Sequence, residues 1–173
     1  MRVYAGRVLA LDVDEVEVEE PGGVRAKREV VRHSGSVATL AVHGDGRVIL
    51  VRQYRYPVNA AVWELPAGRR DPHETPEAGA RRELEEETGL RAERLEPMSV
   101  FYTTPGFCDE VMHLFRASEL RQHAARPEPD ERIEVRALSL EEARAMMERG
   151  EIREAKTLVA LLIESERRRV QRA

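Results

Sequence analysis

Residues 68–90 constrain this chain more than any other part of its sequence, because they fix the order and spacing of several charged side chains. They read GRRDPHETPEAGARRELEEETGL: a glycine, five residues, a glutamate, seven residues, Arg-Glu-Leu, one residue, Glu-Glu, one residue and Gly-Leu. Thr75-Pro76 is typical of a helix start, and Gly89 is typical of the residue just past a helix end. The segment between them is therefore predicted to be one helix of about three to four turns.

Three glutamates share one side of this predicted helix. At about 100° per residue, Glu83, Glu86 and Glu87 lie within roughly 100° of one another. Like charges at this spacing destabilise an isolated helix unless cations bind them. Oxygen ligands favour a hard cation, so Mg²⁺ is expected, with Mn²⁺ as the alternative. A divalent ion on a pyrophosphate polarises the phosphoryl group and lowers the pKa of a bound water, so the pattern indicates hydrolysis of a diphosphate. The alternative interpretation is a solvent-exposed acidic face.

With every defined position filled, the segment resembles the Nudix box, GX5EX7REUXEEXGU, in which U is aliphatic. The resemblance implies an α/β fold, a Nudix α/β/α sandwich with a mixed β-sheet. It also implies that Glu83, Glu86, Glu87 and the main-chain carbonyl of Ala67 bind the metal ions. Arg82 and Glu74 pair in this family to hold the loop against the helix, so both are expected to support the site. Glu86 and Arg82 are counted with the expected catalytic residues. Leu84 and Ala80, on the neighbouring face, are expected in the core.

Three further segments are similar to the ADP-ribose pyrophosphatase branch of that family: LVRQYR at 50–55, WELPAG at 63–68 and YTTPGFCDE at 102–110. The branch carries a proline about fifteen residues beyond the box, and Pro105 stands there. This resemblance, from about Arg7 to Leu162, implies Mg²⁺-dependent hydrolysis of ADP-ribose, a small nucleoside diphosphate sugar, to AMP and ribose 5-phosphate. The alternatives are hydrolysis of GDP-mannose, ADP-glucose or a dinucleotide such as FAD, and a non-catalytic Nudix module that senses a nucleotide.

The same resemblance indicates residues that bind the substrate. Arg55 is a ligand for the pyrophosphate or the terminal ribose, since a guanidinium fork suits phosphate oxygens. Its alternative role is a strand-end arginine in a surface ion pair. Arg52, Pro105 and Glu110 lie in the same similar segments and are also expected to bind substrate.

Arg28 and Glu29 match positions that contact the nucleoside end in the family, often across a dimer interface, so a homodimer is expected. The alternative interpretation is that Arg28 and Glu29 only form part of the solvent-exposed face of a strand. Family members often stack an aromatic side chain on adenine in this region, but residues 7–33 contain no aromatic residue.

The general base is expected in the acidic loop PEPDERIE at 127–134, which lies well after the box and contains two prolines that favour an extended backbone. Glu131 is the preferred residue, because it lies two residues before the strand-forming Ile133, as in the family. Glu128 and Asp130 are close alternatives. The alternative interpretation is that these three acidic side chains have no catalytic role and only keep the loop exposed to solvent.

Composition limits the partners and the location of the protein. The chain has 173 residues, which suits one domain with a core of its own. Its net charge is −4, with 28 basic and 32 acidic residues interspersed, so there is no basic field for nucleic acid. No apolar run approaches the ~18 residues of a membrane span. The single cysteine, Cys108, agrees with a reducing compartment, so a cytoplasmic protein is expected.

Hydrophobic periodicity predicts two regions. Residues 1–35 form an antiparallel β-ribbon and dimerisation element: a strand at 7–20 with a bulge near Asp14-Glu15, a turn at Pro21-Gly22-Gly23 and a strand at 24–33. Residues 36–173 form the Nudix domain. Its expected strands are 36–43, 47–54, 61–65, 98–103, 110–117 and 133–138. Two helices follow, one opened by Ser139 and ended by Gly150, and one at 155–170.

Overall fold

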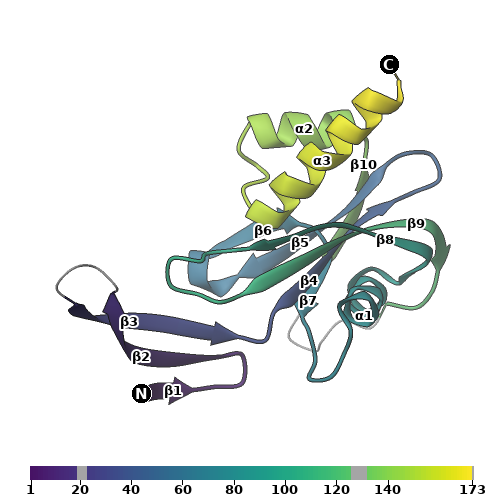
Figure 1. The fold of residues 1–173 in the computed structure, drawn as a ribbon. Helices are drawn as coiled ribbons and strands as arrows, with labels where there is room; N and C mark the ends of the chain where they lie inside the picture. The colour runs from purple at the N-terminus through teal and green to yellow at the C-terminus, as the bar shows by residue number, and fades with distance from the viewer. Residues whose placement is uncertain (19–22, 126–131, 173) are drawn as a thin grey trace.

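A computed structural model describes residues 1–18, 23–125 and 132–172. These residues form a ribbon that projects from a larger body (Figure 1). The ribbon is a three-stranded antiparallel sheet of β1 (Arg2–Ala5), β2 (Leu9–Val18) and β3 (Val24–His33).

The body is built on a mixed sheet, as predicted. Its strand order in the described chain is β10-β5-β4-β9-β8, with β6 paired to β5 and β7 paired to β4. The β4–β9 pair is parallel and every other pair is antiparallel. The strands are β4 (Ser36–Val42), β5 (Val48–Arg55), β6 (Ala60–Glu64), β7 (Ala67–Arg69), β8 (Leu90–Tyr102), β9 (Val111–Gln122) and β10 (Glu134–Leu138), with a short 3₁₀ turn η1 (Tyr56–Val58) between β5 and β6.

The sheet lies between α1 (Pro76–Thr88) on one face and α2 (Leu140–Glu148) with α3 (Ala155–Gln171) on the other (Figure 1). Strand β4 shows why, because it is buried along its whole length and its side chains alternate between faces. Val37 clusters with Ala80, and Ala41 clusters with Leu84, both toward α1. The intervening Ala38, Leu40 and Val42 cluster with Ala143, Met146, Ala160 and Leu161 of α2 and α3. The α/β/α sandwich is confirmed, as is the place of Leu84 and Ala80 in its core.

The box helix begins and ends where its signals predicted. The Thr75 side chain accepts a hydrogen bond from the Ala78 amide at 3.2 Å, and Pro76 is the first helical residue. Gly89 ends the helix with a φ of 67°. A Cβ at this glycine would lie 2.7 Å from the His123 carbonyl oxygen, so both the conformation and the space require glycine. Ser139 likewise caps α2 by accepting from the Glu142 amide at 3.0 Å.

The predicted bulge near Asp14-Glu15 is wrong. Strands β2 and β3 pair without interruption from Leu9↔His33 to Val18↔Val24, and the ribbon's register shift lies instead in β1, between Arg2 and Tyr4. The apolar pattern changes face along β2 because no described residue of the ribbon belongs to the buried core clusters. Neither face of the ribbon therefore has to be uniformly apolar within this chain. The predicted turn at 21–23 falls largely outside the described residues.

Other boundaries differ mainly at β8 and β9. The predicted strands 36–43, 47–54, 61–65 and 133–138 agree with β4, β5, β6 and β10 to within one residue at each end. Strands β8 and β9 are much longer than predicted, because they continue as a hairpin that pairs Leu90 with Gln122. The added part of β8 carries exposed charged side chains, among them Arg91, Glu93 and Arg94, so its sequence does not show the apolar alternation by which strands were predicted. Strand β1 was not predicted.

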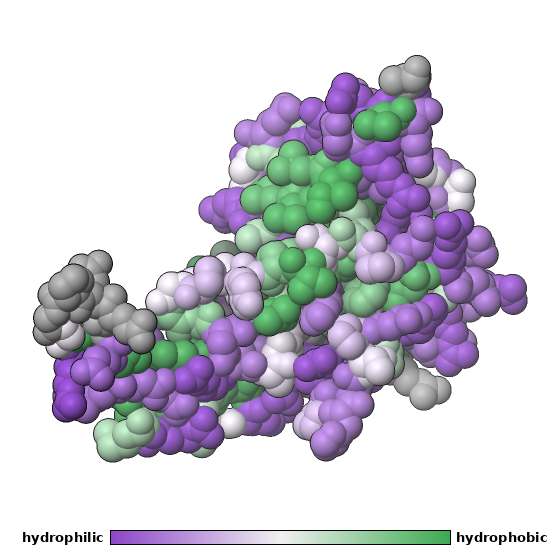
Figure 2. Space-filling view, in the orientation of Figure 1, coloured by the Kyte–Doolittle hydropathy of each residue, from purple (hydrophilic) through white to green (hydrophobic). Residues whose placement is uncertain are grey.

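The ribbon is joined to the body beside the β8–β9 loop. The Val31 amide donates to the Phe107 carbonyl at 2.7 Å, and the Asp109 amide donates to the Val31 carbonyl at 3.1 Å. Asp109 also accepts from the His33 amide at 2.7 Å and from Arg32 at 3.3 Å. In Figure 2, hydrophobic residues are visible over α3 and the strands near it, and in smaller patches on the ribbon. None of the described helices combines the length and the apolar character that crossing a membrane requires.

Candidate active site

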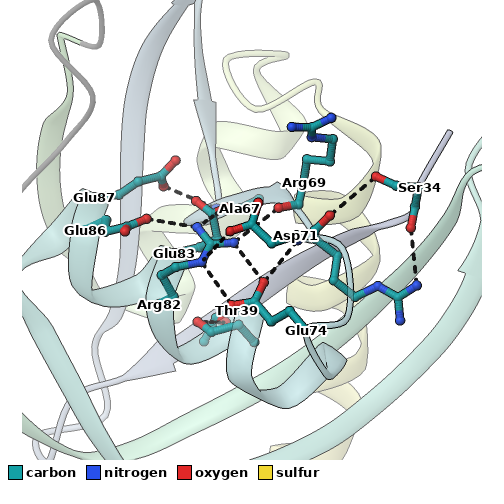
Figure 3. Close-up of polar contacts among 12 residues, drawn as sticks. Ser34, Thr39, Ala67, Arg69, Asp71, Glu74, Arg82, Glu83, Glu86 and Glu87 are labelled. Carbon is teal, nitrogen blue, oxygen red and sulfur yellow. Dashed lines mark hydrogen bonds and ion pairs between the residues drawn. The ribbon is translucent and has the colours of Figure 1, made fainter. Parts of the chain in front are cut away.

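The three box glutamates project from α1 toward the backbone at Ala67 and Gly68, where β7 begins (Figure 3). Glu87 is only 4% exposed, and its carboxylate accepts a hydrogen bond from the Ala67 amide at 3.2 Å. The Glu83 carboxylate lies against Gly68, so close that a Cβ on this residue would be 2.2 Å from it. The box glycine is thus required by a close approach of side chain to backbone. Two of the predicted metal-binding glutamates, Glu83 and Glu87, thus lie against the Ala67–Gly68 backbone.

Arg82 lies at the centre of these carboxylates (Figure 3). Its Nε and Nη2 each donate to Glu74 at 3.0 Å, and Nη2 also donates to the Arg69 carbonyl at 3.2 Å. Its Nη1 donates to Glu83 at 2.8 Å and to Glu86 at 3.0 Å. The bonds to Glu74 raise the pKa of Arg82 against the opposing effect of burial, and those to Glu83 and Glu86 add to the rise. In return, Arg82 lowers the pKa of Glu74. The predicted Arg82–Glu74 pair is present and ties residues 69–74 to the helix.

The donor set fits a hard divalent cation. Glu83, Glu86 and Glu87 supply carboxylate oxygens, and the Glu83 carboxylate lies against Gly68, the residue that follows Ala67. In this structure Arg82 Nη1 bridges Glu83 and Glu86, and across the described residues no three acidic, histidine or cysteine side chains converge on one point as ligands. A cation held by both carboxylates would therefore compete with Arg82 for their oxygens.

A cleft of about 280 Å³ opens beside the glutamates. Its lining combines the box residues, among them Arg69 of β7, with basic side chains from two other places in the chain: Arg7 of the β1–β2 turn and Arg55 at the end of β5. The Arg69 guanidinium also donates to the Arg7 carbonyl, which fixes the ribbon turn at the rim. Carboxylates beside guanidinium groups suit a diphosphate that is bound through cations and through direct hydrogen bonds. A larger hollow of about 1000 Å³, between α2, α3 and the turn at Gly46, contains none of the predicted site residues.

Sequence reasoning found Arg55 but missed Arg7 and Arg69. Arg69 directly follows the box glycine, so its position was a usable signal. Arg7 had no such signal, because its place at the cleft depends on how the ribbon packs. Arg55 donates from Nε to Glu64 at 2.7 Å; the glutamate is 2% exposed and the arginine 40% exposed, so the pair is buried at its acidic end and reaches the surface at its basic end.

The other predicted substrate residues lie away from the cleft lining. Arg52 lies over the Trp63 ring, 6.0 Å from its centroid, and pairs with Glu134 at 3.6 Å. Glu110 accepts hydrogen bonds from the hydroxyls of Ser36 and Thr103. Pro105 is exposed in the β8–β9 loop. Substrate contacts of these residues remain predictions.

Arg28 and Glu29 are exposed on β3 of the ribbon, and the Arg28 side chain donates to the Lys27 carbonyl at 3.1 Å. In a single chain neither residue lines the cleft. Glu131, Glu128 and Asp130, the candidates for the general base, fall outside the described residues.

Comparison with known proteins places this geometry in a family. A NUDIX domain model matches residues 32–161. The ADP-ribose pyrophosphatase of Bacillus subtilis (strain 168) is 43% identical over 162 residues, which cover 92% of this chain and 86% of that protein. The methanol dehydrogenase activator of Bacillus methanolicus is 40% identical over 162 residues, with the same coverage of both chains. A solved ADP compounds hydrolase has the same fold, with a TM-score of 0.85, 24% identity and coverage of 99% of this chain and 92% of that one. The chain belongs to the Nudix hydrolase family.

Proposed function

We propose that the protein hydrolyses the pyrophosphate bond of ADP-ribose, giving AMP and ribose 5-phosphate. The observation that carries this proposal is the complete box: Glu87 and Glu83 contact the Ala67–Gly68 backbone, and Glu86 shares Arg82 with Glu83, beside a cleft lined by arginines. The choice of ADP-ribose is supported by 43% identity to an enzyme named for that substrate over 92% of the chain.

Mg²⁺ is the proposed cofactor, with Mn²⁺ as a substitute, held by Glu83, Glu86, Glu87 and the Ala67 carbonyl. When bound, such an ion supplies Lewis acidity at the phosphoryl group and charge for the leaving phosphate. The protein's own part is positioning: the buried Glu87 carboxylate is fixed by the Ala67 amide, and Arg82 holds the loop after β7 to the helix. Arg55 donates to phosphate oxygens at the cleft.

The base that deprotonates the attacking water is proposed to be Glu131, with Glu128 and Asp130 as alternatives. The two guanidinium edges of Arg82 are both used by acidic partners, and an arginine does not deprotonate at physiological pH. Arg82 therefore cannot serve as the base.

The active form is proposed to be a homodimer joined through the ribbon. The ribbon exposes large apolar side chains, with Val3, Tyr4 and Val24 each more than half exposed. Exposed apolar residues on a projecting sheet are typical of an interface. A second copy would also offer Arg28 and Glu29 to the partner's cleft, which they do not reach within one chain.

The decisive experiment is to incubate the purified protein with ADP-ribose, GDP-mannose, ADP-glucose and FAD, with Mg²⁺ and with EDTA, and to separate the nucleotides by chromatography. Direct detection of AMP from ADP-ribose, abolished by EDTA, is the expected result. A higher kcat/KM for another compound would reassign the substrate. No turnover of any compound, together with measurable binding, would favour a nucleotide sensor.

A further inference from the structure

A buried group of charges connects the cleft arginine Arg55 to the start of α3. The Glu64 side chain is 2% exposed and accepts from Arg55 Nε at 2.7 Å through Oε1. Its other oxygen accepts from Lys156 Nζ at 2.9 Å. Lys156 is itself 10% exposed, and its ammonium group also lies 3.2 Å from Glu154. Glu64 thus lies between two cations, and only one of these cations lines the cleft.

The Glu64 carboxylate is ionised although it is buried. Burial alone raises its pKa, but Lys156 and Arg55 outweigh that effect and leave the pKa below its ordinary value. A buried carboxylate is costly unless it is paired and hydrogen-bonded, and here both oxygens are. Replacing such a group by packed apolar residues is often neutral for stability, so stability alone does not explain its presence.

The same turn of α3 also holds the backbone that leads to the metal-binding carbonyl. The Leu65 amide donates to Thr157 Oγ1 at 2.9 Å, and Thr157 Oγ1 donates to Glu154 at 2.8 Å. Leu65 lies two residues before Ala67. The first turn of α3 therefore fixes two parts of the site, the Arg55 guanidinium and the strand connection at residues 64–67.

We infer that Glu64 and Lys156 are positioning residues that hold Arg55 in the orientation that binds the substrate diphosphate, an inference that rests on the proposed function. Neither residue lines the cleft. An arginine side chain loses rotamer entropy when it is fixed, and a guanidinium already held by Nε meets part of this cost before the substrate arrives. The expected signature is weaker substrate binding without a matching loss of turnover.

The chain contains a matched control for this test. Glu164 of α3 is 1% exposed and, like Glu64, lies between two cations, at 3.1 Å from Arg116 Nε and 2.8 Å from Arg168 Nε. Neither of these arginines lines the cleft at the box. Glu164→Gln therefore removes an equally buried charge from a similar network, whose ion pairs with Arg116 and Arg168 do not involve Arg55.

The experiment measures KM and kcat for ADP-ribose at saturating Mg²⁺, and melting temperature, for Glu64→Gln, Glu164→Gln, Arg55→Ala and the double variant Arg55→Ala/Glu64→Gln. Glu64→Gln is expected to raise KM by about tenfold or more, since a hydrogen bond to a charged group is worth roughly that factor, and to change kcat less. The double variant should be no worse than Arg55→Ala, and Glu164→Gln should lower the melting temperature while KM stays unchanged. A KM of Glu64→Gln within twofold of wild type, or multiplied effects in the double variant, would overturn the inference.

Two additions keep the outcome decisive. If Glu64→Gln does not fold, Glu64→Asp keeps the buried charge but shortens its reach to Arg55, and it must still raise KM. The Kd of inorganic pyrophosphate, the part common to all substrates of the panel, is measured for each variant by calorimetry. If the wild type does not cleave ADP-ribose but Glu64→Gln still weakens pyrophosphate binding about tenfold relative to Glu164→Gln, the proposed substrate fails and the positioning role stands. Unchanged pyrophosphate binding in Glu64→Gln would remove the positioning role.

Discussion

Arg82 and Glu74 are joined along one full edge of the guanidinium group, since Nε and Nη2 of Arg82 donate to the two carboxylate oxygens of Glu74, each at 3.0 Å. The remaining nitrogen of Arg82 bridges Glu83 and Glu86. The residue that holds the loop after β7 therefore also neutralises two predicted metal ligands. Because Glu74 occupies Nε and Nη2, only Nη1 of Arg82 donates to Glu83 and Glu86.

Replacing Glu74 by glutamine should destabilise the protein in a pH-dependent way. The loss of two charge-assisted bonds is expected to cost about 1–3 kcal/mol at neutral pH. Arg82 lowers the pKa of folded Glu74 below its ordinary value of 4.5, so this stabilisation is complete above pH 4.5 and is lost as the pH falls through the folded-state value. Urea unfolding from pH 7 to pH 3 should show the difference between wild type and Glu74→Gln shrinking below pH 4.5. Parallel curves over the whole range would contradict this account.

Gly68→Ala should impair metal binding while the protein stays folded. The new Cβ would lie 2.2 Å from the Glu83 carboxylate, which must move away from Gly68. Displacing a ligand in this way typically costs roughly 10- to 100-fold in metal affinity or activity. Electron paramagnetic resonance of bound Mn²⁺ gives the affinity directly. Gly44→Ala is the control, because nothing lies within 4 Å of a Cβ there and its affinity should match wild type. Equal Mn²⁺ affinity in both variants would remove Glu83 from the metal site.

Local signals sufficed for the box helix and the layers around it. Thr75, Pro76 and Gly89 marked the ends of α1, and the burial of β4 along its whole length follows from its largely apolar sequence. Contacts between distant parts of the chain left no local pattern. Glu64 meets Lys156 across 92 positions, and the Arg7 carbonyl meets Arg69 across 62. In the ribbon, the apolar residues of β2 change from one face to the other without a bulge, and β2 pairs regularly with β3. The described residues of the ribbon do not pack against the core, so neither face has to be apolar throughout.

Glu87→Gln should abolish most of the activity without unfolding the protein. A ligand carboxylate stabilises the transition state by several kcal/mol, and each 1.36 kcal/mol is a factor of ten, so a loss of about 100-fold or more in kcat is expected. Glu85→Gln on the same helix is the control. Its carboxylate pairs with Arg91 and His123, away from the cleft, so its kcat should equal wild type. Near-normal turnover by folded Glu87→Gln would show that the metal assignment is wrong.

The homodimer can be tested through the exposed residues of the ribbon. Sedimentation at micromolar concentration should show a dimer for wild type and a monomer for the double variant Tyr4→Asp/Val24→Asp. Each substitution replaces an apolar side chain, more than half exposed in one chain, by a charged one. Arg28→Ala should stay dimeric but raise KM by roughly tenfold. A wild-type protein that sediments only as a monomer would remove the dimer, and with it the proposed role of Arg28 and Glu29 in a shared site.

The choice of base is tested by comparing Glu131→Gln with Glu128→Gln and Asp130→Asn. A general base contributes typically 10²–10⁴-fold to the rate, and an amide cannot accept the proton from water. Glu131→Gln should therefore lose about that factor in kcat, whereas its Kd for ADP-ribose, measured by calorimetry without added metal, should stay within twofold of wild type. The other two variants should keep most of their turnover, since a residue that only keeps the loop solvated has no proton to transfer. An inactive Glu128→Gln or Asp130→Asn beside an active Glu131→Gln would move the base to that position, and three active variants would place proton transfer outside this loop.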